Sequence, residues 1–337
     1  MTKYISSLPK SAIVLDAHSD ILNDVVERRA QGQREVIAKR HLPNLKKGEV
    51  NALVCAIYVE AKYKPDMALS RALQLLDAMH SELEETPQQL KLCFRVGDFE
   101  EATRSGKLGV LLGLEGGEPL GIDFSVLRLF YRMGVRLVGL TWNQRNQIAD
   151  GVGEQQTRSR LTKYGIGLVK QLNKLGMIID LAHISESAFY HVLEVSEAPV
   201  VMSHGNCKSV CDHERNLTDK QLEALAAKGG VLGITFYPPI VAPDQPNLAT
   251  VLEHMHHAVS VMGIDHVGIG ADFSDFITWD TGEVGEGFEK KPKTKGLESV
   301  VGMPKLVEGL LANGYSQEQV LKILGGNFLR VFQQIIG

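Results

Sequence analysis

Histidines and carboxylates recur at the carboxyl ends of short apolar runs, and these are residue types that bind metal ions in hydrolytic enzymes. The set comprises His18, Asp20, Glu115, His183 and His204. A single catalytic zinc usually takes three protein ligands and keeps one open position. Three histidines and two carboxylates exceed that number, so we expect a pair of metal ions.

The spacing of these residues suggests how the two ions are shared. His18 and Asp20 are two residues apart, so on a strand both side chains point the same way and reach one ion. Glu115 ends an apolar run, where a carboxylate is costly to bury unless it meets a cation. We expect Glu115 to bridge the ions and His183 and His204 to hold the second one. Ions about 3.5–4 Å apart lower the pKa of a shared water and polarise the bond that it attacks.

Two other groups of metal-type residues have simpler interpretations. The segment 204–213 superficially resembles a zinc knuckle, with His204, Cys207, Cys211 and His213. Its spacing is unusual for structural zinc, and we expect the cysteines to be small buried hydrophobic residues. A predicted helix also contains three histidines, which we expect on a solvated helix face: His254, His256 and His257.

Eight short apolar runs, alternating with amphipathic stretches, must position these side chains. The predicted strands are 12–15, 52–59, 110–114, 136–140, 177–181, 199–202, 231–235 and 266–270. The predicted helices are 66–83, 124–133, 162–175, one opening at Ser185, 248–262, 303–313 and 316–336. Apolar strands alternating with helices favour a parallel sheet covered by helices.

Eight such units predict an α/β fold, a (β/α)8 TIM barrel, as a single domain over residues 1–337. The competing doubly wound sheet lacks its glycine-rich nucleotide turn, because Gly113, Gly116 and Gly117 do not form GxGxxG. The stretch 280–296 is rich in Gly, Glu and Lys and has no periodicity, so we expect a loop after the eighth strand. Active sites of such barrels lie at the carboxyl ends of the strands.

Composition excludes several functional classes. The 36 Lys and Arg residues against 40 Asp and Glu give a net charge of −4, with no basic block that would indicate a nucleic-acid or anionic-lipid partner. No apolar run approaches the roughly 20 residues of a membrane span, and no secretory signal is recognisable. We therefore expect a cytoplasmic protein. The four cysteines are too few for a disulfide framework and should be free thiols.

At these residues the sequence resembles the membrane (renal) dipeptidase family, binuclear zinc peptidases of the amidohydrolase-like barrels. The similar motifs are DAHSD (16–20), GLEGGEP (113–119), LTWNQRN (140–146), DLAHIS (180–185), MSHGNCKSVC (202–211), HERNLTD (213–219), GIGADF (268–273) and GGNFLRVF (325–332). The resemblance implies a zinc dipeptidase with two Zn²⁺ ions per subunit and a metal-bridging hydroxide. It implies the same five ligands that the spacing indicates.

The resemblance also implies roles outside the ligand set. Arg215 would bind the substrate carboxylate, since a guanidinium offers a planar, always charged fork. Asp272, with Glu115, would be catalytic and move the proton of the attacking water to the leaving amine. Trp142 replaces a family histidine thought to contact the scissile carbonyl, and Asn143 or Asn146 is the alternative donor there.

Further expectations concern substrate and assembly. The resemblance implies a homodimer, and some microbial relatives favour dipeptides with a C-terminal D-residue. One alternative is a barrel of the same kind that acts on lactams, lactones or other non-peptide bonds. Many of those barrels have a carboxylated lysine at the end of strand four, which this chain lacks. A second alternative is a non-catalytic barrel that binds metal or peptide.

Overall fold

The computed structural model describes residues 9, 11–277 and 293–337. Its strands are β1 (Leu15–Ser19), β2 (Ala52–Tyr58), β3 (Leu90–Leu92), β4 (Leu108–Glu115), β5 (Val135–Gly139), β6 (Ile178–Asp180), β7 (Val201–Gly205), β8 (Val231–Ile234) and β9 (Val267–Ile269). Its helices are α1 (Ile21–Ala30), α2 (Leu42–Lys47), α3 (Ala68–Glu85), α4 (Val96–Arg104), α5 (Phe124–Arg132), α6 (Lys163–Leu175), α7 (Glu186–Val195), α8 (Asp219–Ala227), α9 (Pro238–Val241), α10 (Leu248–Met262), α11 (Met303–Ala312), α12 (Gln317–Leu321) and α13 (Asn327–Ile336).

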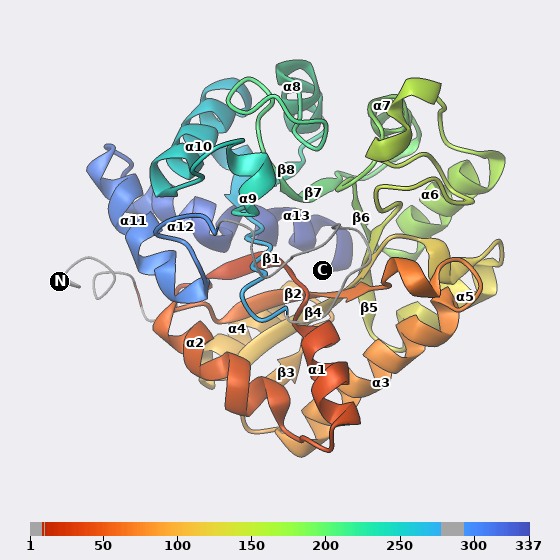
Figure 1. Ribbon diagram of the computed structural model, residues 1–337, viewed down its shortest axis with the longest axis horizontal. Coiled ribbons are helices and arrows are strands. Elements are labelled where there is room, and N and C mark those ends of the chain that lie inside the picture. The colour runs from red at the N-terminus through yellow and green to blue at the C-terminus, as the bar shows by residue number, and fades with distance from the viewer. Residues whose placement is uncertain (1–8, 10, 278–292) are drawn as a thin grey trace.

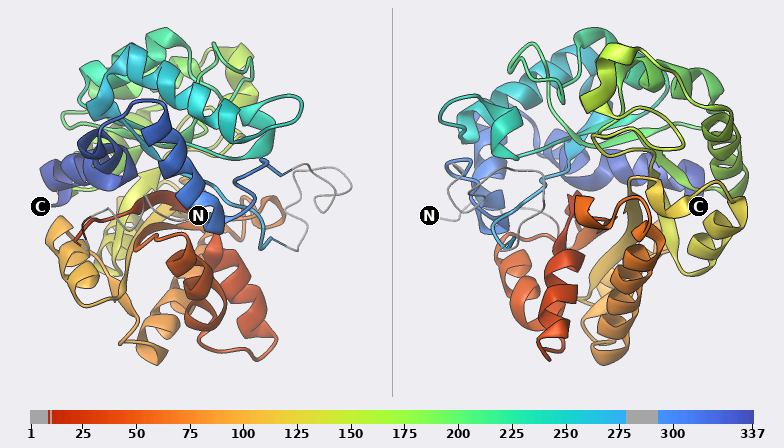
Figure 2. Two further views of the ribbon diagram at one scale, coloured as in Figure 1. Left: turned by 90° about the vertical axis from the view of Figure 1, so that its left-hand side faces the viewer. Right: turned by 45° about the vertical axis from the view of Figure 1, so that its right-hand side comes forward.

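The strands of the described residues form one parallel sheet that curves into a nearly closed barrel. Its order is β1-β2-β4-β5-β6-β7-β8-β9, and every pair along it is parallel. Helices surround the strands on the outside, as Figures 1 and 2 show. Parallel neighbours need a crossover connection, usually a helix, which is why strands and helices alternate along the chain. The predicted (β/α)8 barrel is therefore confirmed.

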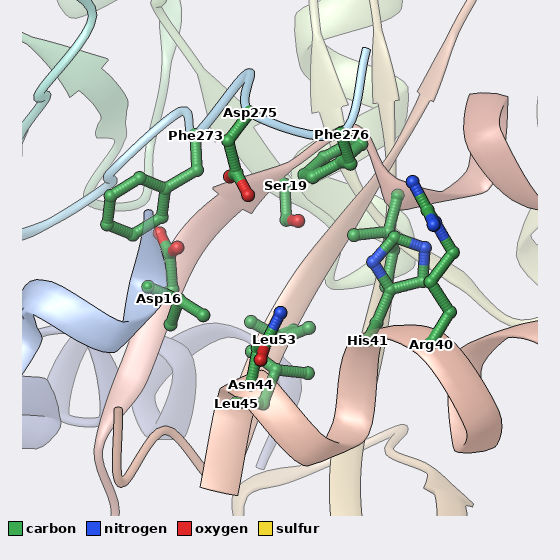
Figure 3. Close-up of a pocket in the computed structure, with 12 residues that line it drawn as sticks. Asp16, Ser19, Arg40, His41, Asn44, Leu45, Leu53, Phe273, Asp275 and Phe276 are labelled. Atoms are coloured by element: carbon green, nitrogen blue, oxygen red, sulfur yellow. The ribbon is translucent and has the colours of Figure 1, made fainter. Parts of the chain in front are cut away.

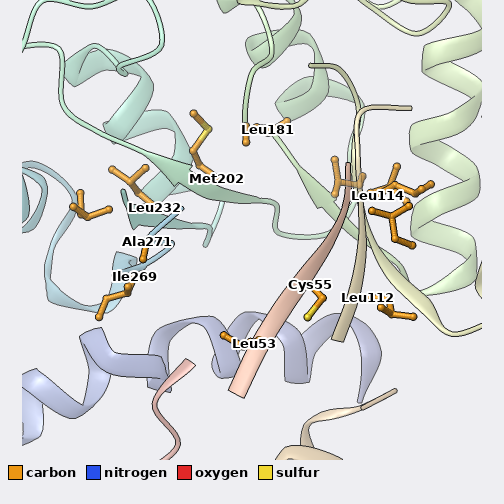
Figure 4. Close-up of a cluster of buried hydrophobic side chains, with 14 of the residues drawn as sticks. Leu53, Cys55, Leu112, Leu114, Leu181, Met202, Leu232, Ile269 and Ala271 are labelled. Atoms are coloured by element: carbon orange, nitrogen blue, oxygen red, sulfur yellow. The ribbon is translucent and has the colours of Figure 1, made fainter. Parts of the chain in front are cut away.

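Side chains alternate between the barrel interior and the helix layer, as the two-residue period of a strand requires. On β2, Ala52 and Val54 belong to the inner cluster, whereas Leu53 and Cys55 pack with the outer one. Figure 4 shows this outer cluster, with side chains from β2, β4, β7, β8 and β9. Along β4 the inner positions are Leu111 and, two and four residues later, Gly113 and Glu115. This alternation turns Glu115 toward the barrel axis.

Helix α13 closes the barrel at the amino ends of the strands. Phe328 and Phe332 are fully buried and pack with the first inward residues of several strands, such as Ile178 and Val231. A Cβ on Gly268 of β9 would lie 2.5 Å from the Phe328 ring, so this strand position has no room for a side chain. With one end filled by aromatic rings, the opposite, carboxyl end is left for polar side chains.

The barrel closes between β1 and β9 through a side chain. No ladder joins these two strands in the described residues. Instead, Oδ1 of Asp16 in β1 accepts a hydrogen bond from the backbone N–H of Ala271, two residues beyond β9, at 2.7 Å. The same oxygen accepts from the N–H of His18 at 3.2 Å. Asp16 therefore fixes the seam next to a candidate metal ligand.

Several details differ from the sequence-based expectations. Strand β3 was not predicted because three residues are too few to show a periodic pattern. It pairs with the start of β4, whereas β5 pairs with a later part of the same strand. The predicted helix 316–336 is interrupted by a π-helical turn at Lys322–Gly326. Helices α1, α2, α4, α8 and α9 were also not predicted. Most of the expected loop at 280–296 lies outside the described residues.

The histidines of α10 correct one expectation. His254 is fully buried, not on a solvated face, and its Nδ1 accepts from the N–H of Cys207 while Nε2 faces the carbonyl of Val241. All four cysteines are buried and unpaired, as expected. No helix in the described ranges combines the length and the apolar character that crossing a bilayer requires.

Candidate active site

The five predicted ligands lie together at the carboxyl ends of the strands. His18 is in β1, and Asp20 follows it as the N-cap of α1. Glu115 is the last residue of β4, His183 follows β6, and His204 is in β7. Their ligand atoms come from four segments of the chain that are distant in sequence, as expected for an active site at the mouth of a barrel.

Glu115 lies between the two groups of ligands. Its Oε2 is 3.4 Å from Nε2 of His18, and its Oε1 is 3.1 Å from Nε2 of His183. The same Oε1 is 3.9 Å from Nε2 of His204. One carboxylate oxygen therefore faces each group, which is the arrangement of a carboxylate shared by two cations.

The first group contains His18, Asp20 and Asp272. Nε2 of His18 is 3.5 Å from Asp20 Oδ1 and 3.9 Å from Asp272 Oδ1. The β1–β2 register shifts between Asp16 and Ser19, so His18 departs from strict alternation at the point where it enters the site. Asp20 lies beyond the strand, and the two side chains meet because the helix begins there. His18 and Asp20 are therefore neighbours, as predicted, but the start of α1 and not strand alternation brings their side chains together.

The second group consists of two imidazoles that face each other. Nδ1 of His183 is 2.7 Å from Oδ1 of Asn143, an atom that can only accept, so this nitrogen carries the proton. Nδ1 of His204 is 2.9 Å from Oγ of Ser203. The Ser203 hydroxyl in turn donates to Oδ2 of Asp180 at 2.5 Å, so it accepts from His204.

These contacts leave the lone pair of both Nε2 atoms directed at the same point. Nε2 of His183 and Nε2 of His204 are only 2.8 Å apart. Two unprotonated nitrogens cannot hydrogen-bond to each other, and their lone pairs repel. A cation bound beside both nitrogens would remove that repulsion, and neutral imidazole is the form that binds metal.

Buried polar atoms without partners give an independent test of whether a metal fits. Among the described residues, Nε2 of His18, Oδ1 of Asp20 and Oε2 of Glu115 are buried and make no hydrogen bond. Buried polar groups are normally paired because an unpaired one costs about 1–3 kcal/mol. All three atoms are good zinc ligands. The residues present therefore fit a metal centre.

Burial dominates the protonation of the carboxylates. It raises the pKa of Glu115 to about 7 and that of Asp272 to about 6, with the nearby charge of His18 opposing the shift in both cases. Burial also raises the pKa of Asp16 to about 7. Clustered, desolvated carboxylates of this kind are concentrated at functional sites.

The basic groups shift in different directions. Burial, followed by the charges of Arg215 and His18, lowers the pKa of His183 well below its usual range. Burial also lowers the pKa of His204. Burial alone would lower the pKa of His18, but Glu115 and Asp20 outweigh it and hold that pKa well above its usual range. Burial lowers the pKa of Arg215 to about 10, so the guanidinium stays charged at neutral pH.

Two site residues adopt a backbone conformation that is unusual for residues with a side chain. His183 has φ of +66° and Asp272 has φ of +54°. The left-handed region is sparsely populated by non-glycine residues and costs of order 1–3 kcal/mol, and such positions cluster at functional sites. The fold therefore holds these two side chains in place at some expense of local stability.

Two other features lie apart from this cluster. A cavity of about 160 Å³ opens outside the barrel wall between β1, α2 and the residues after β9 (Figure 3), and none of the candidate ligands lines it. The knuckle-like segment also forms no site, since the close groups of metal-type residues in the described ranges do not include Cys207 or Cys211.

Comparison with known proteins identifies the family. The sequence profile of membrane dipeptidases, peptidase family M19, matches residues 2–336. The chain belongs to the membrane dipeptidase family.

Relatives and solved structures agree with this membership. The chain is 32% identical to dipeptidase verJ of Clonostachys rogersoniana, over 89% of this chain and 76% of that protein. It is 32% identical to human dipeptidase 3, over 98% of this chain and 66% of that protein. A Rhodobacter sphaeroides metallo peptidase, liganded with a phosphinate mimic of the dipeptide L-Ala-D-Ala, has a TM-score of 0.85 and 25% identity. That comparison covers 96% of this chain and 99% of the other.

Within this dipeptidase-family fold, the expected substrate residues have distinct surroundings. Arg215 is buried beside the ligand cluster, and the charges of Asp272 and Glu115 act on it. Trp142 stacks on His183 with ring centroids 5.4 Å apart. Asn143 holds His183, as described above, and Asn146 is occupied by the backbone of its own loop.

Sequence reasoning missed two residues that support the ligands. Asp180 and Ser203 form the chain of hydrogen bonds behind His204, and both are buried. The sequence contained a signal for them, because Asp180 and Ser203 are polar residues at inward positions of strands that begin with apolar residues.

Proposed function

We propose that this chain is a zinc-dependent dipeptidase, a single domain over residues 1–337 that hydrolyses the peptide bond of dipeptides. The observation that carries the proposal is the pair of facing Nε2 atoms of His183 and His204, 2.8 Å apart, with Glu115 3.1 Å from the first. Membership of the dipeptidase family supports the same activity.

The ligand assignment follows the two groups. His18 and Asp20 would hold one ion, His183 and His204 the other, and Glu115 would contact both. Two zinc ions bound there would lower the pKa of a water and polarise the substrate carbonyl. Ser203 and Asn143 keep the two imidazoles in the tautomer that presents Nε2.

The remaining steps belong to side chains of this chain. Arg215 binds the free carboxylate of the dipeptide, which fixes the substrate and limits its length to two residues. Asp272 accepts the proton of the attacking water and gives it to the leaving amine. Trp142 packs against the substrate at the position where the family histidine would donate, and the free N–H groups of Asn143 are the available amide donors.

The decisive experiment combines metal analysis with a substrate panel. Protein stripped by a chelator should be inactive, and two equivalents of zinc per chain should restore hydrolysis of dipeptides. The panel contains L,L- and L,D-dipeptides, because a preference for a C-terminal D-residue is part of the proposal. It also contains lactams and lactones. Full activity of metal-free protein would contradict the proposal, and faster turnover of lactones would favour the alternative barrel chemistry. A homodimer and a cytoplasmic location stay predictions, to be tested by sedimentation and cell fractionation.

A further inference from the structure

A buried lysine lies next to the candidate metal ligands, at the mouth of the barrel. Lys64 is in the loop after β2, and its Nζ lies 5.3 Å from the ring centroid of Tyr58 and 5.1 Å from that of Trp142. Trp142 in turn stacks on His183. A single aromatic ring therefore contacts both the ammonium group and a proposed ligand.

The nearest carboxylate is close but does not hydrogen-bond to this ammonium group. Oε1 of Glu118 is 3.8 Å from Nζ of Lys64, beyond hydrogen-bond distance, and the two side chains are only 7% and 11% exposed. Among the described residues, Nζ of Lys64 and Oε2 of Glu118 are both buried without a hydrogen-bond partner. A buried ion pair recovers its desolvation cost only when further hydrogen bonds complete it. Both groups thus keep unused hydrogen-bonding capacity.

The position of Glu118 depends on Gly116, which directly follows the proposed bridging residue Glu115. Gly116 has φ of +89°, and a Cβ there would lie 2.3 Å from Oε2 of Glu118. The glycine therefore makes room for the carboxylate to fold back over the chain directly after Glu115. Glu118 thus lies three residues after Glu115, with its carboxylate facing Lys64.

The barrel order places this pair opposite Arg215. Lys64 follows β2 and Arg215 follows β7, and these strands are four places apart in an eight-strand circuit, with the ligand cluster between them. If Arg215 holds the C-terminal carboxylate of a dipeptide, the other end of the substrate extends toward Lys64 and Glu118. That end carries the α-ammonium group and the first side chain.

We propose that Lys64 and Glu118 form the subsite for the N-terminal residue and that this subsite selects an acidic side chain. The α-ammonium group binds Glu118, and the side-chain carboxylate binds Lys64. Each contact completes one of the two unpartnered buried groups. The inference rests on the proposed dipeptidase activity and adds the substrate class: dipeptides that begin with Glu or Asp.

The test compares two substrates that differ only in charge. We would measure kcat/KM for Glu-Ala and Gln-Ala, which are nearly isosteric, with zinc-loaded wild type and Lys64→Met. A hydrogen bond between charged groups predicts a preference for Glu-Ala of about tenfold or more in the wild type. Lys64→Met keeps an unbranched chain between the two rings, and the ratio should fall to about one.

Two further variants separate this role from general damage. Lys62→Met is the matched control, because Lys62 is exposed and lies over Tyr63, and it should keep the wild-type ratio. Glu118→Gln should lower kcat/KM for both substrates about equally, since both carry the α-ammonium group, and should leave the ratio unchanged. Lys64→Gln provides a second neutral side chain if Lys64→Met fails to fold.

The outcomes distinguish this inference from the proposed function. If the wild type hydrolyses Gln-Ala as well as Glu-Ala, or if Lys64→Met slows both equally, Lys64 selects no acidic residue and the inference is wrong. If zinc-loaded wild type hydrolyses neither of these nor any neutral dipeptide, the proposed function itself fails.

Discussion

The hydroxyl of Ser203 lies 2.9 Å from Nδ1 of His204 and donates a hydrogen bond to the buried carboxylate of Asp180. Most metal-binding histidines are oriented by a carboxylate or carbonyl directly. In this chain Ser203 of β7 lies between His204 and the carboxylate of Asp180, which belongs to the neighbouring strand β6.

Loss of this hydroxyl should weaken zinc binding. In Ser203→Ala, His204 loses the acceptor that fixes its tautomer, so zinc affinity should fall by about 10- to 100-fold. Competition with a chromophoric chelator measures this directly. Ser185→Ala is the matched control, because Ser185 is also buried and its hydroxyl makes no hydrogen bond within the described part of the chain. Unchanged affinity in Ser203→Ala would show that the serine is not needed to orient His204.

Arg215 should govern recognition of the substrate's free carboxylate. In Arg215→Met, kcat/KM for dipeptides should fall about 10- to 100-fold, because a charge-assisted hydrogen bond is lost in a buried site. The same loss should not occur with C-terminally amidated dipeptides. Arg215→Lys keeps the charge without the planar fork and should give an intermediate value. An equal loss with both substrate types would assign Arg215 a structural role.

Asp272 should matter for turnover rather than for metal content. Asp272→Asn keeps the size and removes the proton acceptor, so kcat should fall by about 10²- to 10⁴-fold while zinc per chain stays constant. Asp275→Asn, three residues along and exposed, is the control. A parallel loss of zinc would mean that Asp272 acts as a ligand, consistent with its place beside His18 and Asp20.

The aromatic end of the barrel should dominate its stability. Phe328→Ala removes a fully buried ring from beneath the strands and should cost about 3–5 kcal/mol of unfolding free energy. Denaturant titration measures the loss. Phe94→Ala, at a ring that is 41% exposed, should cost much less. Similar losses for the two variants would contradict the packing described for α13.

Acid should remove stability that Asp24 provides. Burial opposes ionisation of this carboxylate, but hydrogen bonds with His41 and Arg28 outweigh it and lower its pKa below the usual 3.8. A lowered folded-state pKa gives stability that is complete above the unfolded pKa and is lost as pH falls through the folded value. Asp24→Asn should therefore be less stable than the wild type at neutral pH, and the difference should shrink below about pH 4. A constant difference across that range would rule out this linkage.

Much of the architecture and of the site could be predicted because both follow from strand periodicity. Parallel strands bring their carboxyl ends to one rim, so polar residues that end apolar runs must meet there, as Glu115 and His204 do. Features of the site that do not follow from strand periodicity could not be predicted from the sequence. The register shift that admits His18, the left-handed backbone at His183 and the loop that carries Lys64 all depend on tertiary contacts.

The missed strand β3 has a related cause. Three residues cannot display a two-residue alternation, and the segment is a strand only because the start of β4 offers it a free edge. The hydrogen bonds behind His204 were missed for the same kind of reason. Asp180 and Ser203 are far apart in sequence and become neighbours only when β6 and β7 pair.

The seam between β1 and β9 separates a proposed metal ligand from the proposed proton acceptor. His18 lies on one side of it and Asp272 on the other, and among the described residues the carboxylate of Asp16 links the two sides by a hydrogen bond. Widening of this seam would move Asp272 away from His18 while the ladders of the other strands stayed intact. We therefore expect the proposed activity to be more sensitive than the unfolding free energy to changes at Asp16.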